Sequence, residues 1–599
     1  MGKRKLSLET LARIPQVFQF DLSPQGDKVA FAWNKEDKVD IYVKNLKTDE
    51  IYKLTEGPES ALEPKWSPDG KTIAYVSDRA GDENFDIFTI PADGGKPSRL
   101  TDDPYDNHSP QWTLDGKWIL FISNRGGDNL NLFRISTGTG EIENLTKGED
   151  PVFSFSLSPE GHRIVFLKGF INRSLWLLDL ETKTSKKILS HQNAEIGTGP
   201  EPWAPNSEKI VFTSNINNFY DIGIYEFKNE TEQWFEKTPY EKSFPIWSPD
   251  GSKIAFTENM EGNILLKVKP LKGAGAKLLG FSEGVCGFMG NLCWSPKGDR
   301  IFFLYSGPKN PPDVWAVDLD GNLEQITFSL KNEIDTEQLV SPNFIRYKSL
   351  DGLEVPALIY LPQKATAKKP PGLVLPHGGP EAQFTNIWNP YVQFMVSNGF
   401  VVIAPNFRGS TGYGRQYQRM SDKDLGGGDL MDTVAAAKYL KESGIADPNK
   451  IGIYGASYGG FMSMIALTKY PDVWAAGVTM VGFFNWKTEY ETEREYLRYY
   501  DSHKVGTPES NPEFYYERSP INFIDKIKAP VLILHGAKDP RCPVTEAYQV
   551  IDLLKKHGKT FEYKIYPDEG HMFRKLSNRI DSYKRMVKFL KKHMKISQA

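Results

Sequence analysis

A serine between two glycines is the residue of this sequence best placed for covalent chemistry. Ser457 stands in the stretch "IGIYGASYGGFM", where a pattern typical of a buried strand runs into a pattern typical of a helix. At such a turn the hydroxyl rises above the sheet, and Gly455 and Gly459 leave the room that so tight a bend needs. A second Gly-x-Ser-x-Gly match, "GFSEG", puts Ser282 in the same frame, but no helical pattern follows it. The context therefore favours Ser457 as a nucleophile and Ser282 as an ordinary turn residue.

A serine hydroxyl is a poor nucleophile without a general base, and an acid and then a histidine should follow it in the chain. His571, in "YPDEGHMF", comes directly after the strand-like "FEYKIYP" and is the expected base, with His535 kept as a structural alternative. Asp539, in "VLILHGAKDPRCPV", is the expected acid, because it would orient the imidazole and stabilise the imidazolium. Asp568 and Glu569 lie nearer to His571 in sequence, and we expect them to cap turns.

Two backbone N–H groups should stabilise the oxyanion that forms when such a serine attacks a carbonyl. Tyr458, directly after the nucleophile, supplies the first donor. The loop "VLPHGGPEA", which follows an earlier strand, supplies the second, and we expect it at Gly379. His377 in the same loop is expected to support the loop rather than to act as a second base.

The first half of the chain repeats one turn phrase, as in "WSPDGKTIAY" and "LSPEGHRIVF", followed by alternating strand patterns. The phrase recurs at steps of 44 to 47 residues, with its first turn residues at Ser23, Ser67, Thr113, Ser158, Ala204, Ser248 and Ser295. Four short strands in a period of this length are typical of a propeller blade. The sequence therefore predicts a seven-bladed β-propeller over residues 15–330.

From residue 331 the period stops, and apolar strand patterns alternate with helical ones up to residue 599. This alternation predicts a doubly wound, mainly parallel sheet with helices on both faces. Residues 1–14 precede the first repeat, and the stretch "LSLETLARIPQ" (6–16) predicts a short helix capped by Ser7. We expect this helix to pack on the C-terminal domain.

Composition excludes several classes of function. The chain has 73 basic and 76 acidic residues, so nothing favours binding to nucleic acid or to an anionic membrane. Three cysteines, the lack of a signal-peptide pattern and the lack of a long apolar run predict a cytoplasmic protein without a membrane segment. No His-Glu-x-x-His pattern and no cysteine cluster occurs, so neither a metal nor another cofactor is expected.

The motifs "HGGP", "GASYGGF", "NFRGSTGYG" and "GGGDLMD" together resemble the prolyl oligopeptidase family of serine peptidases, most closely its acylaminoacyl peptidase branch. The resemblance implies a seven-bladed propeller followed by an α/β-hydrolase domain, with the propeller limiting access to an enclosed site. It implies cleavage of short peptides, with a triad of Ser457, Asp539 and His571 and oxyanion donors at Tyr458 and Gly379.

The resemblance also implies residues for specificity. Arg541 stands at the offset from the acid where acylaminoacyl peptidases carry an arginine that donates hydrogen bonds to a substrate carbonyl. Phe484 and Trp486 stand where relatives line the pocket for the residue before the cut, although aromatic residues in a row are more often core. Dipeptidyl peptidases hold a free amino group with a glutamate pair, and no adjacent Glu-Glu occurs in this chain.

We therefore expect a serine peptidase that releases N-acylated or unblocked N-terminal residues from short peptides. A carboxylesterase and a dipeptidyl peptidase on the same fold stay open as alternatives. A propeller interaction protein with an inactive hydrolase is disfavoured, because all three triad members are present in order. Homo-oligomerisation stays open as well.

Overall fold

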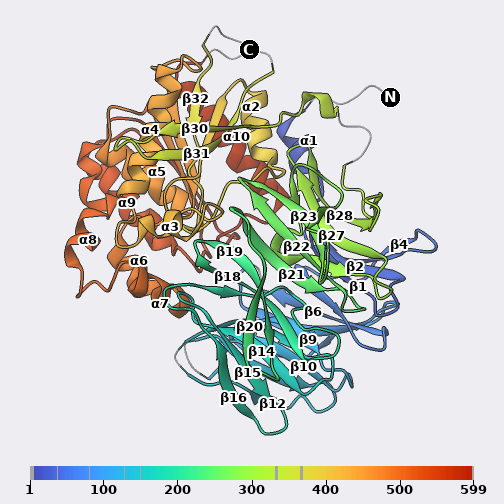
Figure 1. The fold of residues 1–599 in the computed structure, drawn as a ribbon. Coiled ribbons are helices and arrows are strands. Elements are labelled where there is room, and N and C mark those ends of the chain that lie inside the picture. Colours follow the sequence, from blue (N-terminus) through green and yellow to red (C-terminus); the bar gives the residue numbers. More distant parts are fainter. Residues whose placement is uncertain are drawn as a thin grey trace.

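The chain folds into an N-terminal domain of strands and a C-terminal domain of one sheet and its helices (Figure 1). The structure is a computed structural model, and it describes residues 6–36, 38–79, 81–126, 129–148, 150–330, 335–363 and 369–596. Residues 331–334, directly after the predicted domain boundary at 330/331, lie outside the described residues. Residues 1–5 of the predicted N-terminal segment lie outside them as well.

Five four-stranded antiparallel sheets follow one another in the N-terminal domain. The first two contain β1 (Val17–Leu22), β2 (Lys28–Trp33), β3 (Asp40–Asn45), β4 (Ile51–Lys53), β5 (Ala61–Trp66), β6 (Thr72–Asp78), β7 (Phe85–Pro91) and β8 (Ser98–Arg99). The next three contain β9 (Asn107–Trp112), β10 (Trp118–Ser123), β11 (Asn131–Ser136), β12 (Ile142–Asn144), β13 (Val152–Leu157), β14 (Arg163–Lys168), β15 (Ser174–Asp179), β16 (Thr184–Leu189), β17 (Ile196–Gly197), β18 (Lys209–Asn217), β19 (Phe219–Glu226) and β20 (Thr231–Glu236).

A nine-stranded sheet completes this domain. It contains β21 (Glu241–Trp247), β22 (Lys253–Met260), β23 (Asn263–Pro270), β24 (Lys277–Leu278), β25 (Val285–Cys286), β26 (Leu292–Trp294), β27 (Arg300–Gly307), β28 (Asn310–Asp318) and β29 (Leu323–Gln325). Its two halves meet where Ile264 of β23 pairs with Val285 of β25.

The repeated turn phrase has one physical basis. Its serine or threonine hydroxyl accepts the N–H five residues later, as Ser23 Oγ does from Lys28 at 2.9 Å and Ser248 Oγ from Lys253 at 2.9 Å. The glycine of each phrase adopts a positive φ, for example 70° at Gly70. In the fifth copy, where the glycine is missing, Ser207 takes this conformation with φ 58°. The turn chemistry therefore sets the hairpins at a regular spacing.

An eight-stranded sheet organises the C-terminal domain, in the order β30-β31-β33-β32-β34-β35-β36-β37. The first three strands of this order pair antiparallel and the others are parallel. The strands are β30 (Asn343–Lys348), β31 (Glu354–Tyr360), β32 (Gly372–Val374), β33 (Val401–Pro405), β34 (Ile451–Ala456), β35 (Ala476–Met480), β36 (Val531–Gly536) and β37 (Phe561–Tyr566).

Helices cover both faces of this sheet and build two hydrophobic cores. Residues of α4 (Gly428–Glu442), α5 (Tyr458–Lys469) and α9 (Val544–Lys556) form the core of one face, and residues of α2 (Pro390–Ser397) and α10 (Leu576–His593) form the core of the other. The remaining helices are α3 (Arg415–Gln418), α6 (Trp486–Thr492), α7 (Glu495–Lys504), α8 (Pro512–Glu517) and the 3₁₀ segments η1 (Phe288–Gly290), η2 (Thr336–Gln338), η3 (Arg419–Ser421) and η4 (Pro520–Lys526). No helix within the described ranges is long and apolar enough to cross a bilayer.

The N-terminal helix α1 (Leu8–Ala12) begins at Ser7, whose hydroxyl accepts a hydrogen bond from the Thr10 N–H. It lies beside α2 and α10 (Figure 1), and its Leu11 packs in a small apolar cluster with Trp388. The first residues of the described chain therefore pack on the C-terminal domain, on the α2–α10 face of the sheet.

Candidate active site

Ser457 occupies a strained turn between β34 and α5. Its φ of 58° and ψ of −127° are rare for a residue with a side chain, and its N–H donates to the Met480 carbonyl at 3.0 Å. A Cβ on Gly455 would lie 2.3 Å from the Gly459 oxygen, and a Cβ on Gly459 would lie 2.4 Å from the Pro376 oxygen. Both clashes are with backbone, so only glycine fits on either side of the half-buried serine.

Tyr458 is the first residue of α5. The first four N–H groups of a helix have no partner within it and point toward its positive end, so the Tyr458 N–H is available beside Ser457. Its side chain is held elsewhere, because the hydroxyl donates to Asp429 at 2.5 Å and accepts from the Gly426 N–H at 3.2 Å. Burial raises the pKa of the Asp429 carboxyl to about 6. Tyr458 therefore presents its backbone to the site and anchors its ring in the core.

His377 supports the loop that faces Ser457. Its Nδ1 donates to the Gly378 carbonyl at 2.7 Å, its Nε2 lies 2.8 Å from the Ser410 hydroxyl oxygen, and its ring stacks on Phe407 at 4.1 Å. Burial lowers the pKa of His377 to about 4, so the ring is neutral at neutral pH. These contacts fit the supporting role expected of it from the sequence.

Gly378 is the glycine of this loop that lies against Ser457. A Cβ on Gly378 would lie 3.4 Å from the Ser457 Cβ, whereas a Cβ on Gly379 would meet Glu381 and Ala382. Gly379 has a φ of 129°, a conformation that other residues rarely adopt. The sequence pattern does not distinguish Gly378 from Gly379, and an N–H donor at Gly379 stays a prediction.

Asp539 and His571 come together from two neighbouring loops. The two carboxylate oxygens of Asp539 lie 3.0 and 2.9 Å from His571 Nδ1, and both side chains are buried. The same carboxylate accepts the N–H groups of Arg541 and Cys542 at 2.9 and 3.0 Å, which fixes the loop after β36. His535 donates from Nε2 to the Cys542 carbonyl at 2.8 Å and is a structural residue of that loop.

Ser457 is not hydrogen-bonded to His571 in the part of the chain that the structure describes. The structure therefore brings the expected acid and base together, and no hydrogen bond joins His571 to Ser457 within the described residues. Such contacts are often long in ligand-free enzymes and tighten when substrate binds, so the geometry is compatible with a triad. The catalytic roles of the three residues are proposals, to which we return below.

The carboxylates next to His571 in sequence hold the loop that carries it. Glu569 accepts the N–H groups of Arg574 and Lys575 at 2.8 and 3.1 Å and the side-chain amide of Asn578 at 2.7 Å. Asp568 pairs with Lys575. Both acids therefore bind the start of α10, as turn-capping residues do, and neither bonds to the imidazole within the described residues.

One loop of the N-terminal domain reaches the loops of both Asp539 and His571. Asp78, at the end of β6, accepts from Arg574 with both oxygens at 2.7 Å. Glu83, before β7, accepts from Arg541 Nε at 2.8 Å. Arg494, just before α7, donates to the carbonyls of Asp82 and Glu83 at 2.9 and 3.3 Å. Arg541 lies two residues after Asp539, Arg574 lies three residues after His571, and Arg494 lies on a third loop.

These acidic residues were missed by the sequence analysis. The stretch "SDRAGDENF" shows an acidic loop between two strands, but its partners lie 496 residues away for Asp78 and 458 for Glu83. Arg541, expected to bind substrate, is thus already paired, although its side chain is 47% exposed. Its guanidinium is therefore held by Glu83 and stays partly exposed.

Phe484 and Trp486 need a correction. Their exposed fractions are 0% and 2%, and both belong to the core on the α5 face of the sheet. Trp486 packs on Phe483 and Phe514 with ring centres 4.8 and 5.2 Å apart. The structure therefore leaves neither side chain open to a substrate, because the aromatic residues here fill the core.

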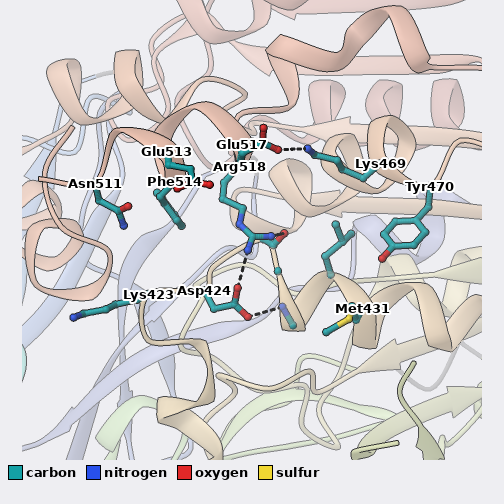
Figure 2. A pocket seen from close by; sticks show the side chains of 14 residues that line it. Lys423, Asp424, Met431, Lys469, Tyr470, Asn511, Glu513, Phe514, Glu517 and Arg518 are labelled. Carbon is teal, nitrogen blue, oxygen red and sulfur yellow. Dashed lines mark hydrogen bonds and ion pairs between the residues drawn. The ribbon is translucent and has the colours of Figure 1, made fainter. Parts of the chain in front are cut away.

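A hollow of about 720 Å³ lies elsewhere on the C-terminal domain (Figure 2). It lies between the start of α4, the end of α5 and α8, and Figure 2 shows two pairs of charged side chains in it. Arg518 binds Asp424 at 2.8 Å and Lys469 binds Glu517 at 3.0 Å. None of the expected site residues lines it, so we assign it no part in the chemistry.

Comparison with known proteins agrees with this architecture. Residues 386–597 match the prolyl oligopeptidase family, and residues 16–168 and 82–218 match the TolB beta propeller domain. The uncharacterized peptidase YuxL of Bacillus subtilis is 24% identical over 95% of this chain and 96% of its own. Dipeptidyl aminopeptidase BIII of Pseudoxanthomonas mexicana is 29% identical over 46% of this chain, and the chain spans 42% of that relative.

Two solved structures show the same fold over nearly the whole chain. A puromycin-hydrolyzing peptidase of Mycobacterium tuberculosis has a TM-score of 0.88 at 21% identity, covering 99% of this chain and 97% of that one. An acylaminoacyl peptidase of Pyrococcus horikoshii has a TM-score of 0.75 at 20% identity, covering 100% and 98%.

Fold and site together define a hydrolase domain with a serine at a strand-to-helix turn, preceded by a propeller-like domain. Residues 386–597 form a prolyl oligopeptidase family domain, and the protein is a serine peptidase. The resemblance stated from the sequence motifs is thereby confirmed.

Proposed function

We propose that this protein cleaves short peptides through an acyl-enzyme on Ser457 and releases N-acylated or unblocked N-terminal residues. The observation that carries the proposal is the buried pair of Asp539 and His571, with both carboxylate oxygens within 3.0 Å of Nδ1, at the same edge of the parallel sheet as the strained turn of Ser457. An imidazole held in this way keeps Nε2 free to take a proton from a serine.

The proposed reaction has two halves, formation of the acyl-enzyme and its hydrolysis, and the same groups serve in both. His571 takes the proton of Ser457 as its oxygen attacks the peptide carbonyl, and then gives that proton to the leaving amine nitrogen. Asp539 stabilises the imidazolium between the two transfers. The N–H groups of Tyr458 and Gly379 are the proposed donors to the oxyanion. Water then attacks the acyl-enzyme, with His571 again as the base.

We also propose the finer architecture, with seven blades and an α/β-hydrolase fold. The nine-stranded sheet counts as two blades, because β21 to β24 and β25 to β29 are joined by a single residue pair. Together with the five four-stranded sheets this gives seven, matching the seven turn phrases. A propeller placed over the hydrolase would admit short peptides and exclude folded proteins. Rapid Ser457-dependent nicking of a folded protein would contradict this filter.

The preference for the substrate's amino end depends on the pair of Arg541 and Glu83. A guanidinium suits an acyl oxygen, whereas a carboxylate suits a protonated amino group. Glu83 favours a second candidate function, release of residues from an unblocked amino end. The deciding experiment offers free and N-acetylated forms of the same short peptides and identifies the products by mass. Turnover of esters but of no peptide would instead support the carboxylesterase.

For the setting of the enzyme we propose the cytoplasm, which suits the three unpaired cysteines (Cys286, Cys293 and Cys542). Short peptides are the proposed partners, and neither nucleic acid nor membrane is among them. Self-association is an open proposal, and measurement of the molar mass in solution decides it.

A further inference from the structure

A cavity of about 220 Å³ lies at the edge of the sheet where Ser457 stands. It is bounded by the ends of β32, β34 and β35 and by the helices α2 and α10. We infer that this cavity binds an aromatic side chain, tyrosine before phenylalanine, of the residue that follows the cut bond. The inference rests on the proposed function and adds to it a class of substrate.

The cavity begins next to the nucleophile. Gly378 and Ala456 both line it, and Ala456 directly precedes Ser457 in the chain. A Cβ on Gly378 would lie 3.4 Å from the Ser457 Cβ and 3.3 Å from the Ala456 oxygen. Because Gly378 has no side chain, no Cβ projects from it toward Ser457. A residue bonded to the reacting carbonyl can therefore reach the cavity with its side chain.

The cavity lies on the side of the leaving group. His571 gives its proton to the leaving nitrogen, so the residue after the cut bond must lie on the histidine side of the serine. Helix α10 begins five residues after His571 and supplies Tyr583 to the cavity wall. Leu375, Tyr454 and Met480 of the wall belong to the core on the α2–α10 face, which is the face opposite to α5.

The walls suit an aromatic ring. Leu375 and Met480 are apolar, and the stacked rings of Tyr391 and Tyr583, 3.7 Å apart and nearly parallel, form one side. A dry cavity of about 150 Å³ is enough to bind benzene, so 220 Å³ holds one substituted ring.

One polar group on the wall has no partner. Tyr454 is 4% exposed, and its hydroxyl makes no hydrogen bond within the described part of the chain. Tyr454 lines the cavity, and a tyrosine side chain bound there would supply its hydroxyl with a partner that phenylalanine lacks. This is why tyrosine should be preferred.

The test measures how an acyl-enzyme divides between water and added amines, which does not require that a peptide be cleaved. An N-acetylated amino-acid nitrophenyl ester forms the acyl-enzyme, and glycinamide, phenylalaninamide or tyrosinamide competes with water for it. The amine nitrogen attacks the acyl carbonyl, the bond to Ser457 Oγ breaks, and the amine proton passes through His571 to that oxygen. The new amide and the free acid are then counted by mass.

We expect both aromatic amides to be captured roughly ten- to a hundredfold better than glycinamide, because the ring is removed from water. Tyr583→Ala removes half of the stacked wall and should reduce this preference to within about threefold, on the scale of the lost packing. Tyr548→Ala, a change of a 47% exposed tyrosine on α9, is the matched control and should keep it. Tyr454→Phe keeps the fold and should reduce the excess of tyrosinamide over phenylalaninamide to about one.

Equal capture of all three amides by the wild type would overturn the inference. So would an aromatic preference that both Tyr583→Ala and Tyr454→Phe leave unchanged. If esters are turned over and peptides are not, the proposed peptidase function fails while the cavity is still tested by the amides. If no acyl-enzyme forms on any ester, the proposed function and the inference fall together.

Discussion

The contact between Asp78 and Arg574 predicts that the propeller-like domain positions the base of the hydrolase. Asp78 is 1% exposed, and both of its oxygens accept from Arg574, three residues after His571. Asp78→Asn keeps the size of the side chain and one acceptor oxygen but removes the charge. If this pair holds the His571 loop in place, the change should impair proton transfer without unfolding the domain.

The size of the effect follows from the contact. A hydrogen bond to a charged group is worth roughly 1.5 to 3 kcal/mol, and Asn retains part of a neutral one. The Arg574 side chain is 29% exposed, so water offsets some of the loss. We therefore expect kcat/KM to fall by roughly ten- to a hundredfold, which corresponds to about 1.4 to 2.7 kcal/mol.

The assay compares a short peptide and a small nitrophenyl ester, because the same base serves both. Both should lose activity by a similar factor in Asp78→Asn, while the midpoint of thermal unfolding stays within a few degrees. Asp93→Asn is the matched control, since Asp93 follows β7 of the same sheet, its side chain is 87% exposed and it pairs with Lys28. Activity within twofold of the wild type on both substrates would refute the positioning role.

Two further predictions concern the contacts between the domains. Glu241 of the N-terminal domain accepts two backbone N–H groups of the hydrolase at 3.0 Å, and burial raises its pKa from 4.5 to about 7. Because the pKa is raised in the folded state, the free energy of unfolding of the wild type is highest below pH 4.5 and falls by up to about 3 kcal/mol as the pH rises above 7. Glu241→Gln cannot ionise at this position, so its midpoint of thermal unfolding should rise relative to that of the wild type as the pH increases. Unfolding midpoints that change in parallel with pH in the two proteins would contradict this. Arg541→Ala should lower kcat/KM on an N-acetylated aminoacyl substrate roughly 10- to 150-fold and change a small ester little. Glu83→Gln is the control, because it removes the ion pair but keeps Arg541. Equal losses of kcat/KM on both substrates in both variants would show that the Asp539 loop had moved and would contradict the binding role of Arg541.

Local patterns let the sequence predict the elements and the strained turn. The hydroxyl of Ser248 closes its turn five residues later, and that bond needs no distant partner. The turn at Ser457 is local in part, because the backbone of Gly459 requires a glycine at 455, whereas the distant Pro376 carbonyl requires a glycine at 459. The order of the later acid and base then selected Asp539 and His571, which the structure places in contact.

What the sequence could not supply depends on contacts between distant residues. Glu83 meets Arg541 across 458 positions, and no periodicity marks such a pair. The sequence around Phe484 and Trp486 fits aromatic residues that line a pocket as well as aromatic residues that fill a core. Only the burial of their side chains in the folded chain separates the two cases. Gly378 and Gly379 are adjacent glycines, so their different neighbours appear only once the loop is folded.

The central claim is that Ser457 carries the covalent step, and a fluorophosphonate probe tests it most directly. Ser282, in the second Gly-x-Ser-x-Gly match, lies in a loop before β25 and serves as the matched control. The wild type and Ser282→Ala should be labelled, with the mass of the adduct mapped to Ser457, and Ser457→Ala should stay unlabelled and lose a factor on the order of 10⁶ in kcat. Labelling of Ser457→Ala at the wild-type rate would contradict the account.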